Sequence, residues 1–369
     1  MTQGPDAAER FARIRLLRSP NVGPVTYYQL LRRFGSARAA LPALPDLAAR
    51  GGAAYRLAPA ERIEAELAAG ARYLFHDDAD YPLTLLTVET PPPVITVRGN
   101  PALFDQPGVA IVGARNASAG AVRLARDFAH GLAGRGFAVI SGLARGIDAA
   151  AHRGALGATH GDGGTIAVIA GGIDVVYPPE HAQLQDQIAE QGLLVAEMPP
   201  GTEPQARHFP SRNRIIAGLA AGTVVVEAAL KSGSLITARL AAECGREVMA
   251  VPGSPLDARA HGCNQLIREG AILVQSADDI AELVQTFEGT ARSTFRDGGF
   301  AGYDRAATDL EPGGARVDAI AGLLGMAPVS VDEVIRQSGA APGTVLDALL
   351  DLELAGRLVR HAGGRVSLV

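Results

Sequence analysis

The chain has 369 residues, about two and a half times the length of a typical domain, so we expect two or three domains and exclude a single small module. Apolar residues make up 47% of the chain and charged residues 20%, which is the balance of a folded soluble protein and excludes a disordered or fibrous one. The net charge is −5, so the protein as a whole does not attract nucleic acid, and a site for a polyanion must be a local basic patch.

The cysteine content and the apolar runs bear on the compartment. Cys244 and Cys263 are too few for a disulfide scaffold and lack the paired spacing of a metal site, which fits a reducing compartment and predicts no bound metal. The apolar runs hold roughly four to six residues, whereas a membrane-spanning helix needs about twenty. The amino-terminal segment has two acids and no apolar core of a secretory signal. We therefore expect a cytoplasmic protein without a membrane partner.

Residues 1–75 are predicted to form a helical domain, because Ala, Leu, Arg and Glu dominate and apolar residues recur at helical spacing. A Pro-Gly turn, SPNVGP at residues 19–24, separates the first two predicted helices, so the domain is similar to a SAM or helix-hairpin-helix module. Such turns bind DNA phosphates through backbone amides or serve only to pack two helices. The sequence leaves both roles open.

Residues 76–288 are predicted to form an extended Rossmann-like domain of the α/β class, with a doubly wound, mostly parallel sheet. Short apolar runs alternate with helical stretches, and most runs are followed by a Gly-containing turn. Continuous apolar strands of this kind are buried on both faces by crossover helices. The eight predicted strands are residues 94–98, 109–112, 137–140, 165–170, 193–197, 223–227, 247–251 and 271–274.

Residues 289–315 lose apolar periodicity and are predicted to be a linker, followed by a winged-helix-like domain at residues 316–369. We expect three helices in this domain, starting near Arg316, after Ser330 and at Pro342, and then two strands. The third helix of a winged helix enters the DNA major groove and carries cations there. Here that helix has Asp347, Asp351 and Glu353 and no cation, so we expect a protein contact or a structural role instead of duplex reading.

In an open parallel sheet, ligands bind outside the carboxyl ends of the strands. Glycine, serine, arginine and asparagine are concentrated at those ends here, and freed backbone amides, hydroxyl groups and guanidinium groups are what a phosphate requires. We therefore predict an anion-binding rim. Its predicted contact residues are Gly113, Arg115, Ser118, Ser141, Gly142, Arg145, Gly171, Gly172, Phe209, Arg212, Asn213, Arg214, Lys231, Ser232, Gly233 and Ser234.

Local charge supports this rim, since residues 113–153 hold six arginines against two aspartates and are four charges positive. Some of these arginines are expected on solvated helix faces, but Arg115 lies at the end of a strand, where a phosphate contact is favoured. Phe209 beside Arg212 and Arg214 gives the mixture that single-stranded nucleic acid needs, because bases stack on aromatic rings and cations follow the backbone. Packing of Phe209 in the core is the alternative. For Lys231 and its neighbours, phosphate binding and helix capping are both open.

Enzyme motifs are missing from the same segments. The dinucleotide fingerprint G-x-G-x-x-G is replaced by GARNASAG, and Ser141 stands where an acid would bind ribose. The single lysine does not follow a glycine loop, which excludes a Walker-type ATPase. No G-x-S-x-G motif is present, and Asp148 and His152 are interpreted as helix-terminal scaffolding. We therefore expect no catalytic residues and no cofactor.

The motifs of this rim closely resemble those of the DNA processing protein A (DprA/Smf) family. The resemblance runs from about residue 81 to residue 271, and its motifs together are highly specific. The helical and winged-helix-like domains on either side match more loosely. The motifs are VGAR, SGLARGIDAAAH, AGGIDVVYP, FPSRNRIIAGL, KSGSLIT and a final VPG…GCNQLIREGA.

This resemblance implies a protein that binds single-stranded DNA without hydrolysing it, forms a homodimer, acts in natural transformation and helps to load the RecA recombinase. It places Arg115 in a positive pocket with Phe209 and the residues that follow. Some relatives have a lysine three residues before the phenylalanine, where this chain has Ala206, so Arg207 is a candidate for the missing cation. The alternative is a nucleotide-processing enzyme similar to phosphoribohydrolases, whose PGG-x-G-T signature is absent, since Ser254 and Pro255 follow Pro252-Gly253.

Overall fold

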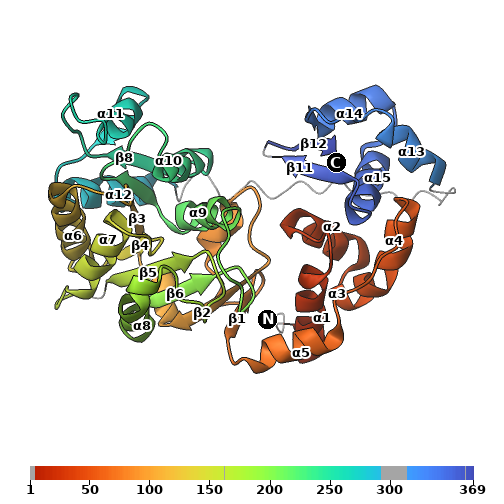
Figure 1. Ribbon diagram of the computed structural model, residues 1–369, viewed down its shortest axis with the longest axis horizontal. Helices are drawn as coiled ribbons and strands as arrows, with labels where there is room; N and C mark the ends of the chain where they lie inside the picture. The colour runs from red at the N-terminus through yellow and green to blue at the C-terminus, as the bar shows by residue number, and fades with distance from the viewer. Residues whose placement is uncertain (1–4, 162, 292–313, 362) are drawn as a thin grey trace. The chain divides into compact units, whose positions relative to one another are not determined.

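The structure is a computed structural model that describes residues 5–161, 163–291, 314–361 and 363–369. The chain divides into two compact units, Ala69–Ala301 and the combination of Met1–Ala68 with Gly302–Val369 (Figure 1). The predicted α/β class, with a helical domain before the sheet and a winged helix after it, is confirmed. Of the predicted linker, residues 292–313 lie outside the described residues, and its two ends belong to helices.

The larger unit is built on a nine-stranded sheet in the order β1-β2-β6-β5-β4-β3-β7-β8-β9. All eight strands predicted between residues 94 and 274 are present, and the sheet is parallel except where β1 pairs with β2 and β2 with β6. The strands are β1 (Arg72–Phe75), β2 (Val94–Gly99), β3 (Gly108–Val112), β4 (Ala138–Ser141), β5 (Gly164–Ile169), β6 (Leu193–Ala196), β7 (Gly222–Val225), β8 (Glu247–Ala250) and β9 (Ile272–Leu273). β1 corrects the predicted end of the helical domain at residue 75, because its residues pair with the sheet.

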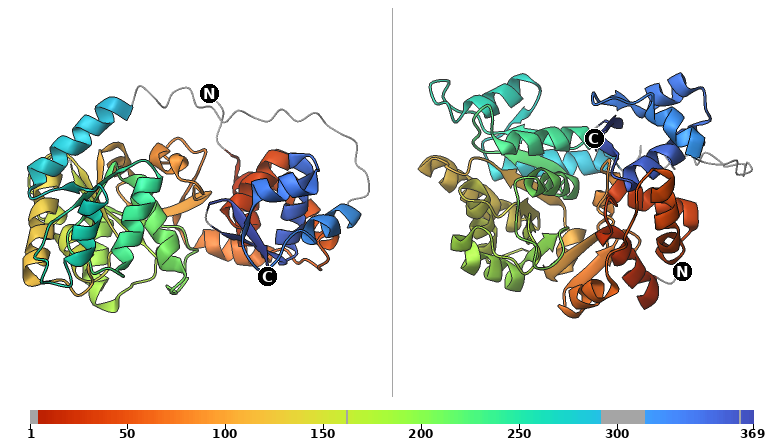
Figure 2. Two further views of the ribbon diagram at one scale, coloured as in Figure 1. Left: turned by 90° about the horizontal axis from the view of Figure 1, so that it is seen from above. Right: turned by 45° about the vertical axis from the view of Figure 1, so that its right-hand side comes forward.

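Helices cover both faces of this sheet (Figures 1 and 2). In β3, Val109 and Ile111 pack against the helices of one face, and Ala110 and Val112 against those of the other. A valine or isoleucine side chain stabilises the fold by about 1.5–3 kcal/mol when fully buried, which explains why apolar residues dominate the strands. The helices are α6 (Ala119–Ala133), α7 (Ile147–Leu156), α8 (Ala182–Gln191), α9 (His208–Leu219), α10 (Gly233–Glu243), α11 (His261–Arg268) and α12 (Ala277–Ala291).

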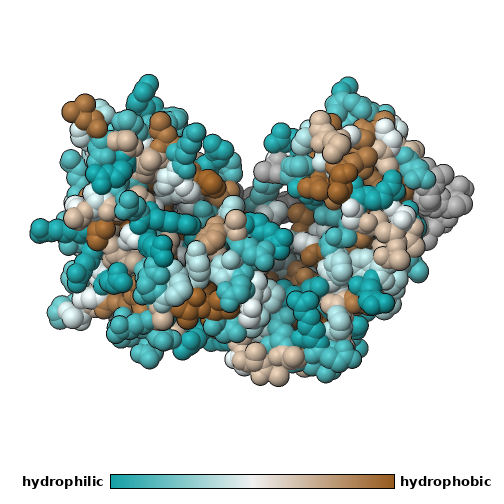
Figure 3. All heavy atoms as spheres, in the orientation of Figure 1, coloured by the Kyte–Doolittle hydropathy of each residue, from teal (hydrophilic) through white to brown (hydrophobic). Residues whose placement is uncertain are grey.

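The direction of winding reverses between β3 and β7, because the chain adds β4, β5 and β6 on one side of β3 and β7, β8 and β9 on the other. In sheets of this kind a crevice opens at the carboxyl ends of the strands at the reversal, and ligands bind there. The loops that follow β3 and β7 lie at this reversal, and the loops after β4 and β5 continue the same edge of the sheet. The visible surface of this unit is mostly hydrophilic, with apolar residues scattered over it (Figure 3).

The smaller unit combines the two ends of the chain. Its amino-terminal helices are α1 (Ala7–Arg18), α2 (Pro24–Phe34), α3 (Ala37–Ala40), α4 (Leu44–Arg50) and α5 (Ala60–Ala68). Its carboxyl-terminal part has the three predicted helices, α13 (Gly314–Ala321), α14 (Val331–Ser338) and α15 (Pro342–Leu354), and a three-stranded sheet of β10 (Val329–Ser330), β11 (Leu358–His361) and β12 (Arg365–Leu368). α14 begins after Ser330, whose hydroxyl accepts a hydrogen bond from the amide of Glu333.

The third helix of the winged helix, α15, packs against the amino-terminal helices. Leu350 and Leu354 are buried in the same cluster as residues of α1, α2 and α4. The carboxylate of Asp351 accepts a hydrogen bond from Arg50 at 3.0 Å. Asn21, in the predicted hairpin turn, donates through Nδ2 to the carbonyl of Leu354 at 3.0 Å. The acidic helix and the hairpin turn therefore have a structural role in this unit.

Candidate nucleic-acid interface

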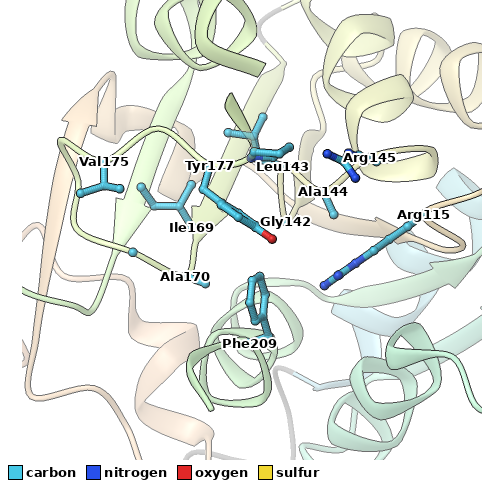
Figure 4. A pocket seen from close by; sticks show the side chains of 12 residues that line it. Arg115, Gly142, Leu143, Ala144, Arg145, Ile169, Ala170, Val175, Tyr177 and Phe209 are labelled. Carbon is cyan, nitrogen blue, oxygen red and sulfur yellow. The ribbon is translucent and has the colours of Figure 1, made fainter. Parts of the chain in front are cut away.

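A pocket lies at the carboxyl ends of β4 and β5 (Figure 4). The loop after β3 contributes Arg115, and the loop after β4 contributes residues 142–145. The loop after β5 contributes Gly171 and Tyr177, and the start of α9 contributes Phe209. Four segments that are far apart in the sequence thus meet at the edge where the sequence predicted a ligand.

Two aromatic rings and one guanidinium group face one another across the opening of this pocket (Figure 4). The guanidinium carbon of Arg115 lies 5.1 Å from the centre of the Phe209 ring. The rings of Tyr177 and Phe209 have centroids 5.8 Å apart and an interplanar angle of 56°. Phe209 is half-buried, so its ring is not enclosed in the hydrophobic core. Sequence reasoning missed Tyr177, which is 44% exposed and lies within the AGGIDVVYP motif.

The loop that carries Arg115 is fixed at both of its ends by Glu227, which follows β7. The amide of Ala114 donates to the Glu227 carbonyl at 2.7 Å. The amide and hydroxyl of Ser118 donate to the Glu227 carboxylate at 3.0 and 2.6 Å. Arg115 itself is exposed, and the structure gives it no hydrogen bond or ion pair with a described residue. The fixed loop therefore presents a free cation at the pocket.

Glu227 also occupies the amino-terminus of α6, which begins after Ser118. In dinucleotide-binding Rossmann folds, the corresponding helix end receives the pyrophosphate. A buried carboxylate at this position repels a second anion. Ser118, predicted to contact phosphate, is thus engaged within the protein, and a dinucleotide is disfavoured at this end of the sheet.

The loop after β4 has few free backbone groups. The carboxylate of Asp148 accepts hydrogen bonds from the amides of Gly142 at 3.2 Å and Ala144 at 3.3 Å. Arg212, predicted to contact DNA, is buried and donates to the carbonyls of Gly142 and Val168, the latter at 2.8 Å. The sequence indicated a free amide at Gly142, but Asp148 takes it, so Arg212 and Asp148 shape the wall of the pocket from behind.

Burial governs the charge of this pair. It lowers the pKa of Arg212 to about 10, against the opposing effect of Asp148, so the guanidinium stays charged near neutral pH. Burial likewise raises the pKa of Asp148, although Arg212 and the two amides oppose this change. The two groups partly compensate each other inside the protein, which is the condition under which buried charges are tolerated.

Three further predicted contacts also point inward. The hydroxyl of Ser141 is fully buried and donates to the carbonyl of Ile111 at 2.6 Å. Asn213 accepts a hydrogen bond from Arg212 at 3.1 Å. Arg214 forms an ion pair with Glu197, and both side chains are largely buried. Ser141 therefore ties β4 to β3, and the contacts of Asn213 and Arg214 support the first turns of α9, which carries Phe209.

The remaining predicted residues are divided between the pocket and its surroundings. Arg145 lines the pocket and pairs with Glu180, but both are exposed, and such pairs are weak, so Arg145 can exchange its partner for a phosphate. Arg207 is exposed at the start of α9. Six further predicted residues lie outside the pocket lining. The Gly172 amide donates to the carbonyl of Thr202, and Gly113 packs closely on Ile147. The other four surround the start of α10 and are Lys231, Ser232, Gly233 and Ser234. The Ser232 hydroxyl caps that helix by accepting from the Ser234 amide.

Most of the chain matches models of one protein family. Residues 72–285 match the family described as DNA recombination-mediator protein A. Residues 7–69 match the DprA-like N-terminal HHH domain, and residues 305–364 match the DprA winged helix domain. The chain belongs to the DNA recombination-mediator protein A family. The pocket described above lies within the matched part of the larger unit.

Relatives in this family are similar over most of the chain. Protein Smf of Synechocystis is 35% identical over 336 residues, which are 84% of this chain and 83% of that protein. The X-ray structure of DprA from Streptococcus pneumoniae is 41% identical, with a TM-score of 0.58, and the match covers 61% of this chain and 78% of that one. A structure of DprA from Helicobacter pylori, whose subject is single-stranded DNA binding, is 27% identical, with a TM-score of 0.52, over 59% of this chain and 98% of that one.

Proposed function

We propose that this protein binds single-stranded DNA at the pocket of Arg115, Tyr177 and Phe209 and acts as a recombination mediator in natural transformation. The observation that carries the proposal is the meeting of one unpaired guanidinium group with two partly exposed rings at the carboxyl edge of the parallel sheet. The similarity to DprA from Helicobacter pylori, whose structure concerns a single-stranded DNA binding mode, supports the same ligand for this chain.

The chemistry of the pocket fits an unpaired strand better than a duplex. A base has an exposed face only in a single strand, and stacking on an aromatic ring contributes about 1–3 kcal/mol per base. Tyr177 and Phe209 offer such rings, while Arg115 and Arg145 lie beside them for the phosphates. In a duplex the bases stack on one another, so the rings would have no base face to contact.

The protein as proposed is not an enzyme. Glu227 disfavours a nucleotide phosphate at the amino-terminus of α6, where a nucleotide-processing Rossmann enzyme would hold one. Within the part of the chain that the structure describes, no group of three His, Cys, Asp or Glu residues is arranged to hold a metal ion.

Over the same residues, no helix combines the length and the apolar character needed to cross a bilayer.

The proposed partners rest on the family resemblance. We place the protein in the cytoplasm as a homodimer that hands single strands to the RecA recombinase. Titration with single-stranded and double-stranded oligonucleotides at two salt concentrations tests the central step. Preference for the single strand, with no release of nucleotide hydrolysis products in parallel samples, supports the proposal. Equal binding of the duplex, or nucleotide turnover, contradicts it.

A further inference from the structure

One residue of the pocket wall, Leu143, has a backbone conformation that needs support. Its φ is 55°, in the left-handed region that residues with a side chain disfavour. Two histidines hold its two backbone groups. The amide of Leu143 lies 3.3 Å from Nε2 of His152, and its carbonyl lies 2.9 Å from Nδ1 of His181.

The donors and acceptors in these contacts fix the protonation of His152. An amide only donates, so Nε2 of His152 must be the unprotonated nitrogen that accepts from Leu143. Nδ1 of His152 must then carry the hydrogen, and it lies 2.7 Å from the hydroxyl of Thr165. That hydroxyl accepts from His152 because its own proton is donated to the carbonyl of Val139 at 2.9 Å. A chain of hydrogen bonds thus runs from inside the sheet to the pocket wall.

We propose that His152, held in one tautomer by Thr165, is a positioning residue that keeps the Leu143 peptide in the shape required to bind single-stranded DNA. His152 is fully buried and does not line the pocket, so it acts through Leu143 and not on the strand. The inference rests on the proposed function, because it assigns a task to the wall of the same pocket.

The surroundings of His152 are consistent with a neutral ring in this role. Burial, together with the nearby charges of His181, Arg212 and Arg153, lowers the pKa of His152 to about 3. Asp148, one turn earlier on α7, holds the adjacent amides of Gly142 and Ala144. The wall is therefore anchored at several points, and loss of the His152 contact leaves a folded loop in which the Leu143 amide has lost its acceptor.

Thr165 offers the test, because it lies in β5 outside the pocket lining. Thr165→Val keeps the volume of the side chain and removes the hydroxyl that fixes the tautomer. Loss of a buried hydrogen bond costs about 1–1.5 kcal/mol, so we expect roughly 5- to 10-fold weaker binding of an oligothymidine strand. Thr165→Ser restores a hydroxyl and should bind within about twofold of the unchanged protein. Thr223→Val is the matched control, since Thr223 is a fully buried β7 threonine whose hydroxyl has no partner among the described residues.

A second pair of variants examines the ring directly. His152→Gln can place its side-chain oxygen where Nε2 accepts the Leu143 amide, so it should retain most of the affinity. His152→Leu fills the space without an acceptor and should weaken binding at least as much as Thr165→Val. Histidine ¹⁵N chemical shifts add a direct reading of the tautomer, with Nδ1 protonated in the unchanged protein and the two nitrogens exchanging their proton in Thr165→Val.

The salt dependence of binding separates this inference from the proposed function. Thr165→Val leaves the phosphate contacts in place, so the slope of log affinity against log salt should stay unchanged while the affinity falls. If an Arg115→Ala control also binds as the unchanged protein does, the pocket is not the DNA site and the proposed function fails. The role of His152 is overturned if Arg115→Ala weakens binding but folded Thr165→Val does not. It is also overturned if Thr223→Val weakens binding as much as Thr165→Val does. In both cases the assignment of the pocket as the DNA site is retained.

Discussion

Replacement of Arg115 by alanine removes an exposed guanidinium group that lies beside the Phe209 ring and has no ion pair with a described residue. Because the Glu227 contacts that hold the loop involve Ala114 and Ser118 and not the Arg115 side chain, the loop and the fold should persist. A hydrogen bond to a charged group contributes about 1.5–3 kcal/mol, so we expect single-strand binding to weaken by roughly 10- to 150-fold if the contact is lost entirely, and several-fold at least.

The salt dependence gives a second, independent magnitude. One phosphate contact to a single strand contributes a slope of about 0.7 in log affinity against log salt. Between 50 and 200 mM salt the deficit of Arg115→Ala should therefore shrink by about 2.6-fold. Fluorescence anisotropy with a labelled oligothymidine strand measures both quantities. Arg115→Lys, which keeps the charge without the planar group, should keep the slope and lose part of the affinity. Unchanged affinity and slope in Arg115→Ala would refute the assignment of Arg115.

Three other outcomes follow from the same geometry. Tyr177→Ala should weaken single-strand binding by about 1–3 kcal/mol while Tyr177→Phe binds normally, and equal effects of the two would argue against stacking. The pKa of His152 is about 3 in the folded protein and 6.5 in the unfolded chain. Between pH 6.5 and pH 3 this histidine is therefore protonated in the unfolded chain but not in the folded protein, so the free energy of unfolding falls as the pH falls. Between pH 7 and 4.5 the unfolding free energy should drop by about 2–3 kcal/mol more than in His152→Gln, a comparison in which the opposite contribution of Asp148 cancels. Urea titrations with parallel pH dependence would contradict this. Deletion of residues 313–369 should leave most single-strand affinity intact, and a collapse of binding in a still-folded protein would show that the winged helix takes part.

The strands of the larger unit could be predicted because burial on both faces leaves a simple pattern. Apolar residues dominate β3, β5 and β7, and each strand is followed by a turn rich in glycine or polar residues. β1 was missed because its sequence, RYLF, has no β-branched residue and directly follows the helical segment before it. In the winged helix, Ser330 marked the start of α14 and the acids of α15 indicated a role other than duplex reading.

The position of the site could be predicted, but the direction of its side chains could not. Rim residues share one edge of the sheet, which places Arg115 and Phe209 together. Whether a rim side chain faces the pocket or the protein depends on partners far away in the sequence. Ser118 is occupied by Glu227, 109 residues later, and Arg212 reaches the carbonyl of Gly142, 70 residues earlier. Neither pairing leaves a pattern in the local sequence, so the sequence indicated that Ser118 and Arg212 are free to donate to a ligand.

A structure of the protein with a short oligothymidine strand tests the central claim most directly. We predict a base against the rings of Phe209 and Tyr177 and a phosphate oxygen within about 3 Å of the Arg115 guanidinium group. A strand bound elsewhere on the larger unit, or on the smaller unit, with the pocket left empty, would contradict the claim.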